Sequence, residues 1–69
     1  MTATDDLWQK GFAEAERRIR TVIRQQGLAS AIQTCKASLR TGLGPGAPVD
    51  QHGMRQALAE FLERHGEKP

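Results

Sequence analysis

The sequence predicts an all-α fold, a small three-helix domain in which a long first helix is followed by two shorter ones. Apolar residues recur every three or four positions in three segments, which is the helical period. Glycine and proline separate these segments at Gly27 and in the stretch 42–48. Only five residues are Val or Ile, and no segment alternates apolar and polar residues over the length of a strand. We therefore expect one helical domain over residues 1–69.

The first helix is expected over residues 5–26. Thr4 is its expected N-cap, and Asp5 and Asp6 fall in the first turn, where the helix dipole favours acidic side chains. Gly27 is the expected end of the helix. The apolar stripe consists of Trp8, Phe12, Ala15, Ile19, Val22 and Ile23.

Gly11 lies inside this expected helix, where glycine costs about 1 kcal/mol relative to alanine. Two explanations remain open. Either another backbone approaches the helix closely at Gly11, or the glycine has no structural role.

The second helix is expected over residues 29–41, with Ile32, Cys35 and Leu39 on its apolar face. Its other face carries small side chains, which suit the close approach of another helix. The alternative is a weakly polar face in contact with solvent. The small residues are Ser30, Thr34, Ala37 and Thr41.

A linker over residues 42–49 and a third helix over residues 51–65 complete the chain, with Asp50 as the expected N-cap and Gly66 as the stop. The third apolar stripe is Met54, Leu58, Phe61, Leu62 and His65. The glycines at 42–46 follow no strand and precede no Lys-Ser/Thr pair, so they do not fit a phosphate-binding loop. The alternative use of Gly42–Gly46 is to hold a small anion together with Arg40 between subunits.

The first helix is much longer than its partners, about 33 Å against about 20 Å. In a simple bundle it would overhang them and expose apolar surface. We therefore expect a homo-oligomer, most simply a dimer, that associates through Trp8, Phe12, Ile19 and Ile23.

Charge is segregated along the chain. Residues 17–49 hold six basic and no acidic residues, so the rest of this chain of net charge +2 carries −4. A helical projection places Lys10, Arg17, Arg20 and Arg24 on one face of the first helix, opposite the apolar stripe, and Arg40 adds to the basic surface. Glu14 and Glu16 precede Arg18 and Arg20 by four positions and are expected to pair with them.

Three interpretations of this basic stripe are open: an ordinary solvated face, a site for an acidic protein surface, and a site for nucleic acid or a nucleotide. A net charge of +2 is small for a protein that neutralises several phosphates. The long connection before the third helix also fails the helix-turn-helix pattern, which needs a turn of three or four residues.

Candidates for catalysis or metal binding are few. Cys35 lies on an apolar stripe, and His52 and His65 are too far apart in sequence to give the spacing of a metal site. We expect no enzyme activity, no cofactor and no metal. The acidic start of the chain and the absence of a long apolar run predict a cytoplasmic protein without a membrane segment.

The expected function is that of a non-enzymatic protein–protein interaction module, a small adaptor, regulator or inhibitor of a larger host complex, which binds through its charged helical face. The alternative is an anion-binding protein that uses Arg17, Arg20, Arg24 and Arg40 to hold a nucleic-acid backbone or a small nucleotide.

Overall fold

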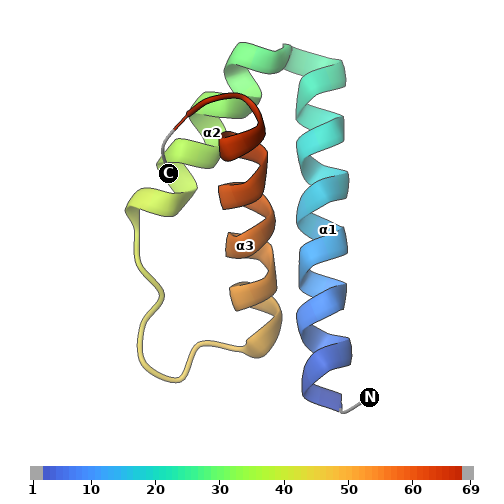
Figure 1. The fold of residues 1–69 in the computed structure, drawn as a ribbon, viewed down its shortest axis with the longest axis vertical. Coiled ribbons are helices and arrows are strands. Elements are labelled where there is room, and N and C mark those ends of the chain that lie inside the picture. The colour runs from blue at the N-terminus through green and yellow to red at the C-terminus, as the bar shows by residue number, and fades with distance from the viewer. Residues whose placement is uncertain (1–2, 68–69) are drawn as a thin grey trace.

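The computed structural model describes residues 3–67, which form three helices and, within that range, no strand. The helices are α1 (Ala3–Gln26), α2 (Leu28–Arg40) and α3 (Val49–Arg64). The predicted all-α, three-helix fold is confirmed. As Figure 1 shows, α2 runs antiparallel to α1, and the linker carries the chain back so that α3 runs parallel to α1.

The helix ends differ from the expected ones by one or two residues. Helix α1 begins at Ala3, so Thr4 lies inside its first turn rather than at the N-cap. Helix α3 begins at Val49 with Pro48 as N-cap, because the Gln51 N–H already donates to the Pro48 carbonyl at 3.1 Å. Asp50 is therefore a residue of the first turn and not the N-cap.

Gly27 separates α1 from α2 with no further residue between them. Its backbone angles, φ 93° and ψ 166°, belong to a region that only glycine occupies at low cost. The chain can therefore reverse direction within one residue, and α2 begins directly at Leu28.

Helices α1 and α3 touch backbone to backbone at two glycines. A Cβ atom added at Gly11 would lie 1.9 Å from the carbonyl oxygen of Asp50, and one added at Gly53 would lie 2.0 Å from the carbonyl oxygen of Trp8. No side chain fits at either position. The structure thus confirms the first explanation for Gly11, a close approach of another backbone, and shows that the other helix is α3.

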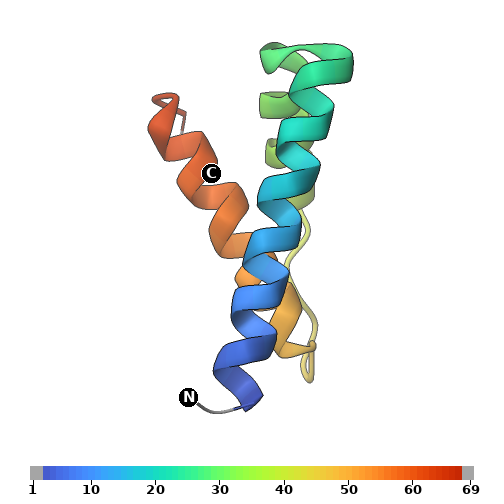
Figure 2. The same ribbon diagram turned by 90° about the vertical axis from the view of Figure 1, so that its right-hand side faces the viewer.

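Four residues beyond each glycine stands a buried alanine, Ala15 on α1 and Ala57 on α3. Small residues at this spacing let two helices cross at short distance. From the crossing the two helices diverge toward their C-terminal ends (Figure 2). The buried residues of α3 are therefore Gly53, Ala57, Phe61 and Leu62. Met54 and Leu58 are only half-buried, and His65 is exposed.

The hydrophobic core fills the end of the molecule where all three helices meet. Its buried residues are Ile19, Ala31, Cys35, Phe61 and Leu62, with Val22, Ile23, Ile32, Leu39 and Leu58 packed against them. Leu62 has no exposed surface. The core therefore joins α3 to the α1–α2 hairpin at the end opposite the glycine crossing.

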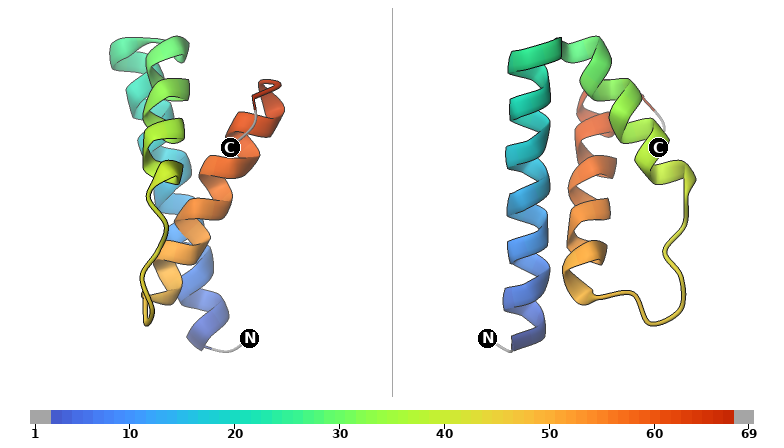
Figure 3. Two further views of the ribbon diagram at one scale, coloured as in Figure 1. Left: turned by 90° about the vertical axis from the view of Figure 1, so that its left-hand side faces the viewer. Right: turned by 180° about the vertical axis from the view of Figure 1, so that it is seen from behind.

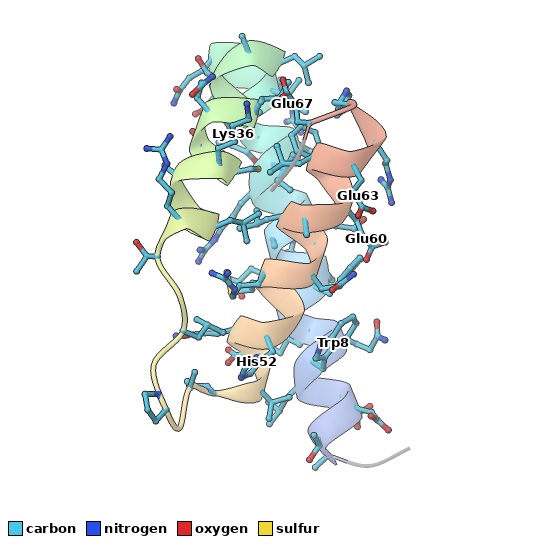
Figure 4. All side chains as sticks on the ribbon, turned by 60° about the vertical axis from the view of Figure 1, so that its left-hand side comes forward. Trp8, Lys36, His52, Glu60, Glu63 and Glu67 are labelled. Atoms are coloured by element: carbon cyan, nitrogen blue, oxygen red, sulfur yellow. The ribbon has the colours of Figure 1, made fainter. Side chains whose placement is uncertain are left out.

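Polar contacts fasten α3 to α2. The Arg55 guanidinium donates to the Thr41 carbonyl at 2.7 Å and to the Leu39 carbonyl at 3.4 Å, which satisfies backbone acceptors at the C-terminal end of α2. Lys36 pairs with Glu67 at 3.0 Å (Figure 4). Arg55, the one cation near the start of the third helix, thus has a structural role.

Gly66 follows the C-cap residue His65 and ends helix α3 as expected, with φ 71°. The Glu67 N–H donates to the Leu62 carbonyl at 2.8 Å, and the Gly66 N–H donates to the Glu63 carbonyl at 3.1 Å. These two bonds form a Schellman motif. The turn directs Glu67 back toward α2, where it meets Lys36.

The expected overhang of the first helix is short. The N-terminal half of α1 lies against α3 at the glycine crossing, and its C-terminal half joins the three-helix core. Two large apolar residues in the described part of the chain are exposed, Leu7 at 48% and Leu28 at 42%. Most of the α1 stripe is therefore covered within the chain: Ala15 and Ile19 are buried, and Trp8, Phe12, Val22 and Ile23 are half-buried.

Candidate functional site

A wide groove opens between α1, α2 and the linker, with α3 as its floor. The right-hand view of Figure 3 looks onto this side, with α3 between α1 and α2. The groove has a volume of about 1040 Å³, which is large for a chain of 69 residues. We call it the large groove; its apolar lining residues are Ala15, Ile19, Val22, Ala31, Cys35, Leu43, Met54 and Leu58.

On the α2 side, the large groove is bordered by small polar side chains. Thr34, Ser38 and Thr41 line it, and all three are exposed. Thr34 and Thr41 belong to the small face that the sequence offers as a packing surface, whereas Ser30 and Ala37 do not line the groove. Small side chains here leave room for another backbone at short distance.

A second, smaller groove of about 190 Å³ runs between α1 and α3 where they diverge. Phe12, Ile19, Ala57 and Phe61 line it, with Glu16, Arg20 and Arg64 as its charged lining. We call it the small groove. Trp8 extends its apolar surface, because the Trp8 and Phe12 rings stack with centroids 5.4 Å apart.

The basic stripe of α1 lies on the ridge between the two grooves. Lys10, Arg17, Arg20 and Arg24 are all exposed. Arg17 lines the large groove and Arg20 the small one. The structure therefore keeps these four cations on one helix and places two of them, Arg17 and Arg20, beside the grooves.

Arg40 does not join the stripe. It comes two residues after Ser38, which places it on the opposite face of α2 from the groove. The predicted five-residue basic surface is thus divided between two helices, and Arg40 lines neither the large nor the small groove.

Of the two ion pairs expected on α1, one forms. Arg18 and Glu14 meet at 2.8 Å. Glu16 and Arg20 have the same spacing but form no ion pair within residues 3–67. The small groove therefore keeps charged side chains that are not neutralised within the described chain.

The self-association residues expected from sequence fall into two groups. Ile19 is buried in the core and Ile23 packs against it. Trp8 and Phe12 are half-buried and stacked beside the small groove. Sequence reasoning missed Phe61 and Ala57 as their neighbours across this groove, since no sequence signal pairs α1 with α3.

The residues considered for catalysis are dispersed. Cys35 is buried, while His52 and His65 are exposed, and the His65 ring packs edge-on against Phe61 at 4.6 Å. Among the described residues there is no group of three or more His, Cys, Asp or Glu side chains that could hold a metal ion. No helix in residues 3–67 has both the length and the hydropathy to span a membrane.

Burial raises the pKa of the Cys35 thiol, because removal from water disfavours the thiolate. We expect iodoacetamide to alkylate Cys35 about tenfold or more slowly in the native protein than in urea, since the thiol must first be exposed. Alkylation followed by mass spectrometry measures both rates. Equal rates would contradict the burial of this side chain.

The same shift predicts how stability depends on pH. In the unfolded chain the thiol ionises above a pH of about 8.5, but in the folded chain it does so at higher pH. The contribution of the Cys35 thiol to the free energy of unfolding is fully present below the unfolded pKa and is lost as pH rises through the folded pKa. Urea unfolding between pH 7 and 10 should show this loss, and Cys35→Ala should lack this component.

Comparison of the chain with known protein families, with curated proteins and with solved structures found no match in any of the three.

Proposed function

We propose that this chain is a non-enzymatic protein–protein interaction module whose large groove binds an amphipathic helix of another protein. The observation that carries the proposal is the groove itself, an apolar channel between two antiparallel helices with a third helix as its floor. A fourth helix laid on α1 and α2 would cover this apolar surface, as helices do in bundles.

The chemistry of the rim supports a partner with acidic residues along one edge of its helix. Arg18 is neutralised by Glu14, and Arg55 is bonded to backbone carbonyls of α2. Arg17, in contrast, is exposed and forms no ion pair within the described residues. An acidic side chain beside Arg17 would add charge complementarity at the edge of an apolar contact.

Such a module would act as an adaptor, a regulator or an inhibitor, according to what the bound helix does in its own protein. The alternative is an anion-binding function of the basic stripe, which the exposure of Arg17, Arg20 and Arg24 favours. The two functions differ in salt dependence. Phosphate binding weakens steeply between low and high salt, whereas apolar association persists.

Peptide binding tests the proposal. We expect a helical peptide with a Leu/Ala face and a Glu-rich edge to bind more tightly than the same peptide with a Lys-rich edge. Arg17→Glu should reverse this preference, because it replaces the unpaired cation of the rim. Fluorescence anisotropy of labelled peptides measures both affinities.

A steric block provides a matched pair of variants on α2. Ser38→Arg places a long side chain in the large groove, whereas Ala37→Arg adds the same charge one residue away, at an exposed position outside it. Only Ser38→Arg should abolish peptide binding. Equal effects of the two variants, or binding of a short DNA duplex that falls steeply with salt while neither peptide binds, would contradict the large groove as the binding site.

A further inference from the structure

The two helices beside the small groove carry charged residues in the same order. On α1, Glu16 is followed four residues later by Arg20, and on α3, Glu60 is followed four residues later by Arg64. Glu16, Arg20 and Arg64 line the groove, and Glu60 lies on the same face of α3 as Ala57 and Arg64. Figure 4 shows Glu60 beside Glu63 on α3. Each wall therefore presents an acid and then a base in the direction of its helix.

These four side chains form no ion pair within the described chain. Glu14 and Arg18, which have the same spacing, form an ion pair at 2.8 Å. Glu16 and Arg20 form none, and neither do Glu60 and Arg64. Glu60 accepts one hydrogen bond, from the Gln56 amide at 3.3 Å. The small groove, together with Glu60 beside it on α3, thus has two acids and two bases that form no ion pair within the described chain.

We propose that the occupant of the small groove is a second copy of this chain, packed groove to groove about a two-fold axis perpendicular to the helices. Helices α1 and α3 run in the same direction, although they diverge, so an axis perpendicular to their mean direction reverses both at once. Each wall then faces its own counterpart in the opposite direction, and its Glu lies opposite the partner's Arg. A two-fold interface needs a self-complementary surface of this kind.

The apolar part of the groove supplies the contact area. Trp8 and Phe12 are stacked and half-buried, and Phe61 lies across the groove from Phe12. Aromatic residues at the centre of a patch and charges at its edge are the usual arrangement of a protein interface. The balanced charge of the four side chains disfavours a phosphate backbone as occupant, since that ligand needs cations alone.

Charge reversal tests the pairing directly. Arg20→Glu with Arg64→Glu makes all four charges acidic, and Glu16→Arg with Glu60→Arg makes all four basic. We expect sedimentation velocity to show the wild type as a dimer at micromolar concentration. Each double variant alone should dissociate, with a dimer Kd raised about tenfold or more by like charges in contact.

Mixing the two variants is the decisive experiment. In a 1:1 mixture every Glu faces an Arg, so a heterodimer should form with an affinity equal to or higher than that of the wild-type dimer. Trp8 is the single tryptophan of the chain, and its emission should shift to shorter wavelength as the dimer forms. Circular dichroism checks that both variants keep their helices.

Arg17→Glu with Arg18→Glu is the matched control. It changes the net charge by the same amount as the acidic variant, but on side chains that line the large groove. This control should remain dimeric. A monomeric wild type, a control that dissociates like the acidic variant, or a mixture that stays monomeric would each overturn the second copy as the occupant.

Discussion

Gly53→Ala is expected to lower the free energy of unfolding by about 3 kcal/mol or more, which is a large share of the stability of a domain of this size. The added Cβ would lie 2.0 Å from the Trp8 carbonyl oxygen and 3.1 Å from the Phe12 backbone nitrogen. Both atoms belong to the backbone of α1, so no side-chain rotation relieves the overlap. Helices α1 and α3 must separate, and the packing between them is lost.

Helix propensity predicts the opposite sign, since alanine stabilises the interior of a helix by about 1 kcal/mol relative to glycine. Urea denaturation followed by circular dichroism therefore distinguishes the two effects. Gly11→Ala should behave like Gly53→Ala, because its Cβ would meet the Asp50 carbonyl. Gly44→Ala is the control: nothing lies within 4 Å of its Cβ. A Gly53→Ala protein as stable as the wild type would contradict the backbone crossing.

Leu62→Ala is expected to cost about 2–5 kcal/mol of unfolding free energy, the range for a leucine removed from a close-packed core. Leu62 has no exposed surface and lies among Ile19, Ala31, Cys35 and Phe61. Truncation leaves a cavity where α3 meets the α1–α2 hairpin, and the rigid helices around it close the cavity only in part.

Leu7→Ala provides the matched comparison, because it removes the same atoms from a side chain that is 48% exposed. It should change stability by less than about 0.5 kcal/mol. Both variants are measured by urea denaturation at one protein concentration. Similar losses for the two leucines would show that the core is not centred on Leu62.

The sequence predicted the three helices well because helix formation depends on the spacing of residues that are close in the sequence. The apolar period of three to four residues and the stops at Gly27 and Gly66 are features of neighbouring positions. Its errors at the N-caps are equally local. Pro48 takes the N-cap position expected for Asp50, because the helical hydrogen bonds begin at the Pro48 carbonyl.

The sequence did not predict which helices pair. The strongest contact in the fold, between α1 and α3, uses Gly11, Ala15, Gly53 and Ala57, and small residues contribute little to a search for apolar stripes. The third helix therefore presents Gly53–Ala57–Phe61 to α1 instead of the face marked by Met54 and Leu58. Small size becomes informative only when a second backbone is known to be close.

Of the candidate site, too, one part could be predicted from the sequence and another could not. The cations of α1 could be placed on one face from their spacing alone, and the structure shows all four exposed. The two grooves beside them could not be foreseen, because each is built from segments far apart in the sequence.

By itself, then, the sequence determined three amphipathic helices, their approximate ends and the segregation of charge. The tertiary structure decided that α1 and α3 cross at paired glycines and then diverge, and this divergence opens the small groove between them. The physical reason is the distance along the sequence over which each kind of interaction acts. Periodicity and capping act over a few residues, whereas a backbone contact between positions 11 and 50 exists only once the whole chain has packed.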